Sequence, residues 1–204
     1  MALRRSAEAG ETRSSILDVS ERLVQTRGFN GFSYADVAAE LGITKAALHY
    51  HFPGKSELGN ALIVRYADRF NDALVGIDAQ GGTAPAKLRA YADLYQGVLR
   101  DERMCLCGML AAEYQTLPVP MRQSVVRFFD DNHTWLARLL KAGRSEGTLH
   151  FSGTAHEAAQ MIVGALEGAM LVARSYGDAD RFEVVATRLV DELAASRPVT
   201  RRRA

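Results

Sequence analysis

The chain has 204 residues, of which 48% are hydrophobic and 24% charged, as expected of a globular protein that buries a core. Its formal net charge of +1 excludes recognition of nucleic acid by overall charge, so any such surface has to be a local patch. No stretch approaches the ~20 apolar residues of a membrane span, and residues 1–10 lack the apolar run of a signal peptide. A chain with only two cysteines is expected to be reduced and cytoplasmic.

The N-terminal part of the chain shows short helical patterns with clear ends. The first covers about residues 13–27 and ends at Gly28, in the place of a left-handed C-terminal cap. Ser33 begins a second helix, and Asp36 follows three residues later, as in a capping box. Gly42 ends this helix, so the sequence predicts a tight turn between the second helix and the segment that follows it.

The remainder of the chain is also predicted to be helical. A short third helix runs from Thr44 to about Tyr50, and Phe52-Pro53-Gly54 separates it from a fourth helix that extends to about Gly76. Further helices are predicted over residues 85–99, 105–116, 120–143, 154–176 and 180–196. The sequence shows neither an alternating strand pattern nor an internal repeat, so the predicted fold class is all-α.

The segment from Ser33 to Leu58 has the spacing of a helix-turn-helix, in which the second helix enters the major groove of DNA. That second helix holds few apolar residues and ends in three ring residues. Residues 42–56 contain two lysines, two histidines and no carboxylate, so positive charge is concentrated on the motif. A helix-glycine-helix turn also occurs in helical domains that bind no DNA, but the charge pattern and the ring residues favour DNA. The expected DNA-binding residues are Ser33, Tyr34, Thr44, Lys45, Ala46, His49, Tyr50, His51 and Lys55.

From the first helix to Leu58, the chain resembles the N-terminal domain of the tetracycline-repressor (TetR) family. The matching motifs are Gly28-Phe29, Ser33, Asp36-Val37-Ala38, Leu41-Gly42-Ile43, Thr44-Lys45, Leu48-His49-Tyr50-His51-Phe52, Lys55 and Glu57-Leu58. The sequence departs from the family at His49, where tyrosine is usual and commonly reaches the DNA backbone or a thymine. A histidine at this position can still donate to a phosphate.

The resemblance implies a homodimer that places two recognition helices on a near-palindromic operator. It also implies a C-terminal domain that binds a small ligand, and a repressor that this ligand releases from DNA; a transcriptional activator is the alternative. We expect an N-terminal three-helix DNA-binding domain over residues 11–58, a larger helical ligand-binding and dimerisation domain over residues 59–197, and a disordered basic tail over residues 198–204.

Two predicted helices near the end of the chain resemble the interface helices of that family. The 154–176 helix carries small residues that permit close helix approach, and the 180–196 helix has an apolar face. The expected dimer interface consists of Gly164, Ala165, Gly168, Ala169, Phe182, Val185, Leu189 and Leu193. The alternative is that both helices pack only within one subunit.

Aromatic residues and methionines with few charges predict a pocket for a mostly apolar ligand. The candidate lining residues are Tyr91, Leu94, Cys105, Met109, Tyr114, Phe128, His133 and Met161. The methionines fit a role as core filling equally well, and a lone histidine on an apolar stripe is more often a core residue than a ligand contact.

Both cysteines lie at the start of a predicted helix, where the helix dipole and the nearby Arg100 and Arg103 favour a thiolate. This leaves a redox or electrophile sensor at Cys105 or Cys107 as an alternative to the ligand pocket, and burial as small hydrophobic residues as another. An enzyme that pairs a cysteine with His133 has no further motif to support it. We therefore predict no catalytic activity, no cofactor and no metal.

Overall fold

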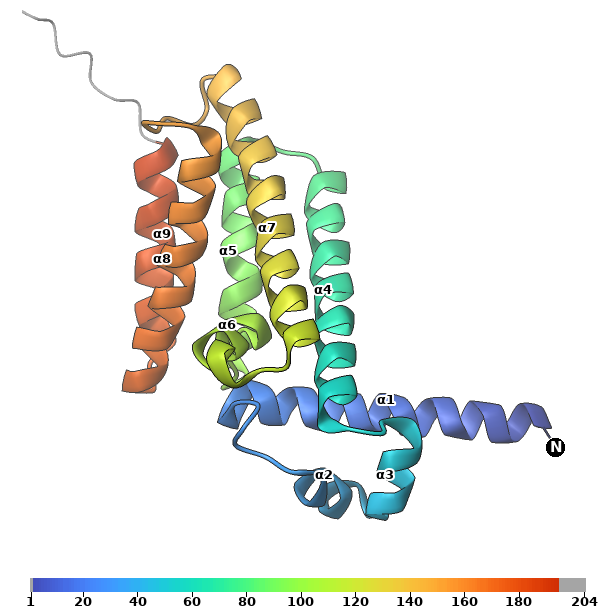
Figure 1. Ribbon diagram of the computed structural model, residues 1–204. Helices are drawn as coiled ribbons and strands as arrows, with labels where there is room; N and C mark the ends of the chain where they lie inside the picture. The colour runs from blue at the N-terminus through green and yellow to red at the C-terminus, as the bar shows by residue number, and fades with distance from the viewer. Residues whose placement is uncertain (1, 195–204) are drawn as a thin grey trace, which may run out of the picture. The chain divides into compact units, whose positions relative to one another are not determined.

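The computed structural model describes residues 2–194, and every regular element in that range is helical (Figure 1). This confirms the predicted all-α class. The chain divides into two compact units. Unit 1 takes the chain up to Asn71 together with Glu102–Phe128, and unit 2 takes Asp72–Asp101 together with the chain from Phe129. Two of the three unit boundaries fall inside long helices, and the third, between Asp101 and Glu102, falls between helices. The domain limits expected at residues 58 and 59 stay a prediction.

Unit 1 contains the N-terminal helices and a short helical segment from later in the sequence. Its elements are α1 (Ala2–Arg27), α2 (Tyr34–Leu41), α3 (Lys45–His51), the first part of α4 (Lys55–Ala79), α6 (Leu106–Ala112), the 3-10 turn η1 (Tyr114–Thr116) and the beginning of α7 (Val119–Ser145). The α1 helix begins well before the predicted residue 13. Residues 2–12 are rich in helix-forming residues but carry no apolar stripe, so periodicity alone missed them.

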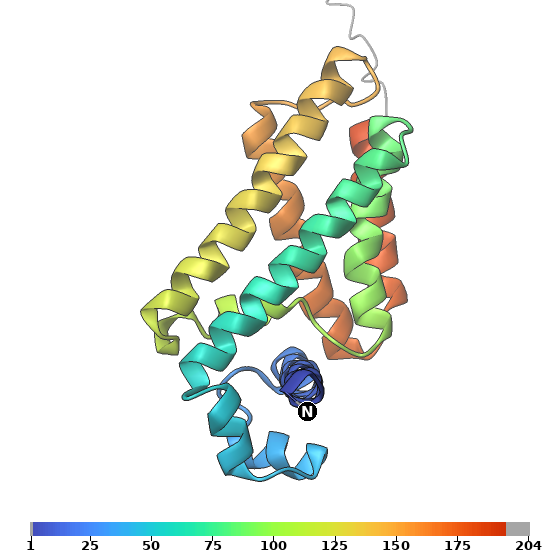
Figure 2. The ribbon, with the colours of Figure 1, turned by 90° about the vertical axis from the view of Figure 1, so that its right-hand side faces the viewer.

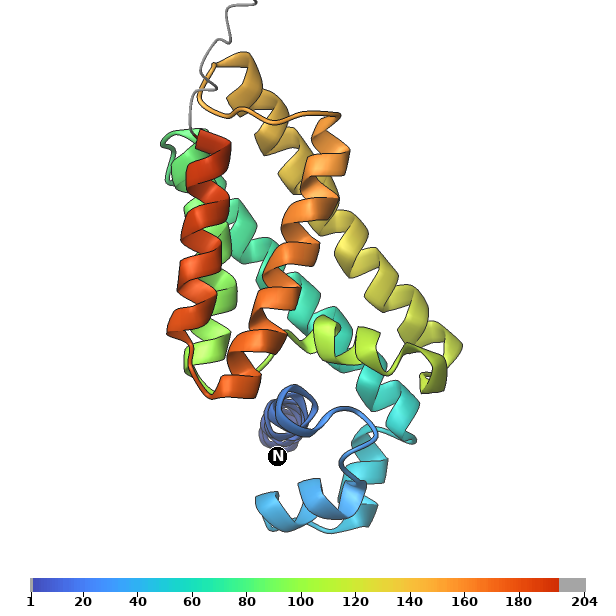
Figure 3. The same cartoon turned by 90° about the vertical axis from the view of Figure 1, so that its left-hand side faces the viewer.

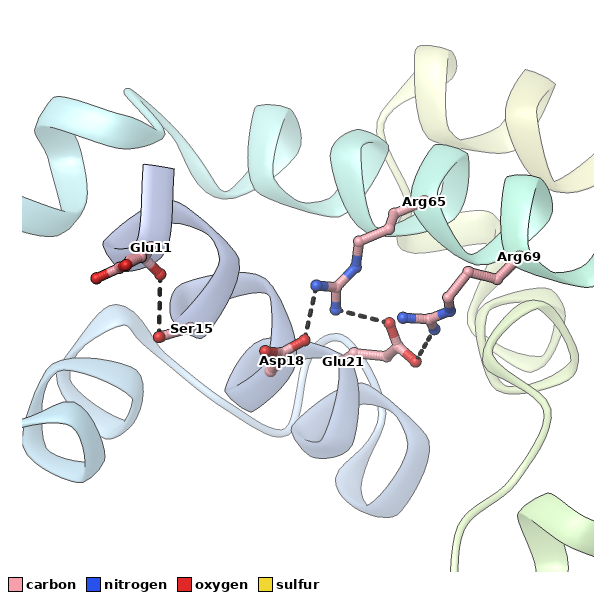
Figure 4. A network of polar contacts seen from close by, with 6 residues as sticks. All are labelled: Glu11, Ser15, Asp18, Glu21, Arg65 and Arg69. Atoms are coloured by element: carbon pink, nitrogen blue, oxygen red, sulfur yellow. Dashed lines mark hydrogen bonds and ion pairs between the residues drawn. The ribbon is translucent and has the colours of Figure 1, made fainter. Parts of the chain in front are cut away.

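An apolar core and a set of ion pairs hold α1 and the beginning of α4 together (Figure 4). Glu21 is buried, and its Oε2 lies 2.9 Å from Nη2 of Arg65. The same guanidinium lies 2.7 Å from Asp18 through Nη1, and Arg69 also contacts Glu21. A buried carboxylate is stable only when it is paired, so this network fixes where α4 leaves the N-terminal helices. The core of the unit includes Ile16, Leu23, Val24, Phe29, Phe32, Leu48, Phe52, Leu58 and Leu62.

Unit 2 is a helical bundle, in which α8 and α9 run side by side (Figure 3). Its elements are the ends of α4 and α7 together with α5 (Ala84–Arg100), α8 (Ala155–Tyr176) and α9 (Asp180–Ala194). Thr154 caps α8 in a reciprocal pair with Glu157, and Gly177 ends it at a left-handed φ of 64°. Both α5 and α8 contact α9, so the apolar face of α9 is covered within the unit.

A polar network crosses the core of unit 2. The Tyr91 hydroxyl lies 2.9 Å from that of Tyr95 and 3.0 Å from Oδ1 of Asn132, and the Tyr91 ring stacks on Trp135 with centroids 5.6 Å apart. The Trp135 indole N–H donates to Asp78 at 3.0 Å. Burial raises the pKa of Asp78, but hydrogen bonds from Trp135 and Lys87 outweigh this effect and keep the pKa of the carboxyl below its usual range.

Across residues 2–194, no helix is of a length and apolar character suited to spanning a lipid bilayer.

Candidate nucleic-acid interface

The helices α2 and α3 follow each other with a short turn between them (Figure 2), and local hydrogen bonds define their ends. At the start of α2, the backbone N–H and the hydroxyl of Ser33 donate to Asp36 Oδ2 at 2.7 and 2.6 Å. These two bonds, first the side-chain and then the backbone one, lower the pKa of Asp36. Gly42 ends α2 at a left-handed φ of 65°, as a residue without Cβ does readily. The predicted ends of α2 are therefore confirmed.

The α3 helix is held by its buried side and presents the opposite side to solvent. Thr44 caps it by accepting a hydrogen bond from the Ala47 N–H at 3.1 Å. Leu48 is buried, and Phe52 is buried at the end of the helix. The exposed residues are Thr44, Lys45, Ala46, His49 and Tyr50, and His51 is half-buried. Except for His51, the residues predicted for this helix thus lie fully on the surface of unit 1, and the Tyr50 side chain is 81% exposed.

The His49 ring is held in place by two contacts. Its Nδ1 lies 3.1 Å from the carbonyl oxygen of Pro53, and its ring centroid lies 4.8 Å from that of Tyr34. The Tyr34 hydroxyl donates to the carbonyl of Phe52 at 3.0 Å. Burial, and then the charge of Glu57, raise the pKa of Tyr34 to about 12, so this phenol stays protonated. Tyr34 thereby orients the histidine, while its own hydroxyl is used inside the unit.

Lys55 corrects one of the predicted DNA contacts. Its ammonium group donates to the carbonyls of Phe29 and Phe32 and lies 4.6 and 4.3 Å from the centroids of their rings. Burial lowers the pKa of the amine, and the charges of Glu113 and Asp36 offset only part of that effect. The sequence motif suggested that Lys55 points outward to a phosphate. Its side chain instead stabilises the turn before α2.

Two residues near the site were missed by sequence reasoning. The guanidinium carbon of Arg13, on α1, lies 4.9 Å from the centroid of the Phe52 ring, which brings an exposed cation to the end of α3. The Glu113 carboxylate accepts hydrogen bonds from the turn that follows α1. Spacing could not reveal Glu113, because this residue lies 84 residues from Phe29 and binds its backbone.

The predicted ligand-pocket residues are distributed over both units. Cys105, Met109, Tyr114 and Phe128 belong to unit 1, and Tyr91, Leu94, His133 and Met161 belong to unit 2. Met161 is 52% exposed on α8, so it does not line the interior of its unit as expected. Tyr114 is also exposed. The His133 ring lies 6.0 Å from that of His156, and burial, then the charge of His156, lower its pKa.

The expected interface residues also separate into two groups. Phe182 and Leu193 are 0% and 5% exposed because they face the interior of unit 2, and Ala169 is buried as well. These three are therefore wrong as interface residues, since they have no surface left to bury against a second subunit. Gly164 and Val185 are exposed, and the other three, Ala165, Gly168 and Leu189, are partly exposed. A methyl group added at Gly164 or Gly168 would meet nothing within 4 Å, so these glycines border open space.

Comparisons with known proteins agree with the architecture. Residues 16–62 match the family described as bacterial regulatory proteins, tetR family, and residues 84–189 match the tetracyclin repressor-like C-terminal domain. The HTH-type transcriptional repressor BepR of Brucella suis is 26% identical over 172 residues, which cover 81% of each chain. The HTH-type transcriptional regulator AcrR of Shigella flexneri is 41% identical over 58 residues, which cover 28% of this chain and 27% of that one.

Solved structures give the same result. A TetR-family regulator from Agrobacterium tumefaciens is 31% identical, with a TM-score of 0.88 over 92% of this chain and 100% of that one. The reduced form of E. coli NemR is 25% identical, with a TM-score of 0.77 over 90% of this chain and 98% of that one. The helix-turn-helix, the helical C-terminal part and these relatives together show that the chain belongs to the tetR family of bacterial regulatory proteins.

Proposed function

We propose that the protein is a cytoplasmic transcriptional repressor, without enzymatic activity, that binds a near-palindromic operator through α3. The observation that carries this proposal is the exposed face of α3, which begins with Thr44, Lys45 and Ala46 on a segment free of carboxylates. In a helix-turn-helix, the first residues of the second helix contact base edges. The small Ala46 side chain allows close approach, and Lys45 supplies a donor for a guanine or a phosphate.

The exposed apolar face of unit 2 supports a homodimer. On α8, Met161, Leu171 and Val172 are more than half exposed, and they share a face with the open glycines Gly164 and Gly168. On the adjacent α9, Val184 is 63% and Val185 41% exposed. Exposed apolar residues on two neighbouring helices are typical of an interface. Two α3 helices in a symmetric dimer would read half-sites about 34 Å apart, or somewhat more.

We further propose that a small, mostly apolar ligand releases the repressor from DNA. The core of unit 2 supports such a ligand, because Tyr91 and Trp135 present stacked rings and the hydroxyls of Tyr91 and Tyr95 can exchange partners with a polar group. Coupling of the two sites would be on the order of 1–3 kcal/mol, as is usual for allosteric proteins.

The experiment is selection of duplexes from genomic fragments by the purified protein, followed by footprinting at several salt concentrations. We expect a protected site with approximate two-fold symmetry and an affinity that falls steeply with salt. Failure to retain any fragment at low salt would contradict the proposal. Placement of the site over a promoter, with transcription measured in its presence, would distinguish a repressor from an activator.

A sensor that acts through cysteine is the second candidate. Cys105 caps α6, because its Sγ accepts a hydrogen bond from the Gly108 N–H at 3.4 Å, and both Cys105 and Cys107 are buried. A solved relative is E. coli NemR in its reduced form. Modification of Cys105 would remove the cap and displace α6. If a thiol reagent releases DNA from the wild type and equally from Cys105→Ser and Cys107→Ser variants, the cysteines are structural.

A further inference from the structure

The turn between α1 and α2 donates hydrogen bonds to a carboxylate from far along the sequence. Glu113 follows the last residue of α6, and its Oε2 accepts from the Phe29 N–H at 2.6 Å. The next N–H, that of Asn30, lies 3.3 and 3.4 Å from its two oxygens. Successive backbone N–H groups that converge on one anion form a favourable binding site, and hydrogen bonds to a charged acceptor are among the stronger ones.

Gly28 makes this approach possible. Its φ is +83°, a backbone conformation that residues with Cβ rarely adopt. A Cβ placed on Gly28 would lie 2.8 Å from Oε1 of Glu113, so any larger residue would also displace the carboxylate. The glycine therefore serves both the end of α1 and the close contact with Glu113.

Further contacts attach the same segment to α1 and to the turn. The Thr116 hydroxyl donates to the Glu113 carbonyl and accepts from the Asn30 side-chain amide, both at 2.8 Å. At the other end of the segment, Gln25 Nε2 donates to the Met104 carbonyl at 2.9 Å, and the Met104 N–H donates to the Gln25 carbonyl at 3.2 Å. The segment 104–116 is thus attached at both ends to α1 or to the turn that follows it.

Glu113 and Lys55 bind opposite groups of the peptide between Phe29 and Asn30, and each binds one further backbone group of the same turn. Lys55 donates to the carbonyls of Phe29 and Phe32, while Glu113 accepts from the N–H groups of Phe29 and Asn30. Ser33, which begins α2, follows this turn directly. Because Phe29 and Phe32 are buried, a change in the turn would move the base of the helix-turn-helix.

We propose that Glu113 is a positioning residue for DNA binding: its carboxylate holds the Gly28–Asn30 turn so that α2 and α3 keep the arrangement that reads the operator. This inference rests on the proposed function. Segment 104–116 lies within residues 84–189, which match the C-terminal family domain, yet it belongs to the same compact unit as the helix-turn-helix. Displacement of α6 therefore acts directly on the turn through Glu113.

The test compares Glu113→Gln with the wild type and with Glu146→Gln, which changes an exposed glutamate in unit 2. The DNA probes are a duplex enriched from a random library by the wild type and an unrelated duplex of equal length. We expect Glu113→Gln to weaken binding to the enriched duplex about tenfold, as when the competent arrangement falls to a tenth of the population. Binding to the unrelated duplex, which depends on phosphate contacts, should change little.

Two further measurements separate positioning from general loss of structure. The ¹⁵N and ¹H chemical shifts of the Phe29 and Asn30 amides should move in Glu113→Gln and not in Glu146→Gln. Thr116→Val, which removes an exposed contact to Asn30, should lower the specific-to-unrelated affinity ratio in the same direction by a smaller factor. It decides the question should Glu113→Gln fail to fold.

An unchanged affinity ratio in Glu113→Gln, with amide shifts that show the contact is lost, would overturn the inference. So would an unchanged ratio in a folded Thr116→Val when Glu113→Gln is unfolded. A wild-type protein that enriches no duplex would instead contradict the proposed function itself.

Discussion

At the scale of single residues, the two contacts of His49 determine which of its atoms can reach DNA. The Pro53 carbonyl can only accept, so Nδ1 must carry the hydrogen of the bond between them. In the neutral ring, Nε2 is then an acceptor, and it cannot bind a phosphate oxygen, which is also an acceptor. A phosphate contact at this exposed position therefore requires the charged imidazolium, unlike a contact by the tyrosine that is usual there.

A contact between His49 and a phosphate would accordingly add one ion pair to DNA binding. His49→Gln should therefore lower the affinity for the operator, whereas His156→Gln, on an exposed position of unit 2, should leave it unchanged. Equal affinity in all three proteins, measured at one salt concentration, would contradict the assignment.

The two lysines of the motif should respond differently to removal. Lys45 is exposed, so Lys45→Ala should lower the slope of log affinity against log salt by about 0.9 per phosphate contact. Lys55→Ala should leave that slope unchanged and instead leave two carbonyls without their donor, at about 1–3 kcal/mol of unfolding free energy. Salt titrations of DNA binding and urea unfolding of both variants check this. An equal loss of salt dependence in both variants would restore Lys55 as a phosphate contact.

Among the helices, α8 and α9 each pack one face inside unit 2, and their exposed faces form the proposed interface with a second subunit. Val172 is 55% exposed on the outer face, and Phe182 is 0% exposed on the inner one. Val172→Asp should give a folded monomer by light scattering, because a charge placed in an apolar interface remains unpaired. Phe182→Ala should lower the unfolding free energy by about 3–5 kcal/mol through the cavity it leaves.

A matched control on another helix tests whether the outer face is special. Val126 is 45% exposed on α7, and Val126→Asp should leave the molar mass unchanged. A protein that stays a dimer with Val172→Asp, or that also dissociates with Val126→Asp, would show that the exposed face of α8 and α9 is not the interface.

The element scale also shows how far sequence reasoning extends. Periodicity and caps predicted α2, α3 and their ends, because Ser33, Gly42 and Thr44 act on their immediate neighbours. The apolar stripe of α9 was predicted, but the surface it packs against was not. A stripe indicates only that a face is buried, and not whether it is buried within the subunit or against a partner. Phe182 and Leu193 proved to face their own subunit.

Long-range contacts between side chains and backbone groups could not be predicted from the sequence. Glu113 binds N–H groups that every residue except proline has, so no residue type at the other end marks the contact. The same holds for Lys55, whose family position suggested DNA while its partners are two carbonyls. Local signals thus defined the DNA-binding helices, whereas the contacts that hold them in place required the structure.

At the scale of the whole molecule, symmetry of the protein and symmetry of the DNA should be linked. A dimer that binds two half-sites gains from the second contact because it is intramolecular, and such gains reach about 10²–10⁴ in affinity. Removal of one half-site from the operator should therefore weaken wild-type binding by a large factor within that range. The monomeric Val172→Asp variant uses one half-site at a time, so the same change in the DNA should alter its affinity by no more than about twofold, the statistical loss of one of two sites.

The four affinities form a double-mutant cycle between protein and operator. If the dimer bridges both half-sites, the effects of Val172→Asp and of half-site deletion are strongly non-additive, because either one abolishes the same bridging contact. Electrophoretic mobility shift titrations at one fixed salt concentration measure all four, since salt alone changes each affinity. Additive effects would mean that each subunit binds DNA independently, and the palindromic operator would then have no basis in the dimer.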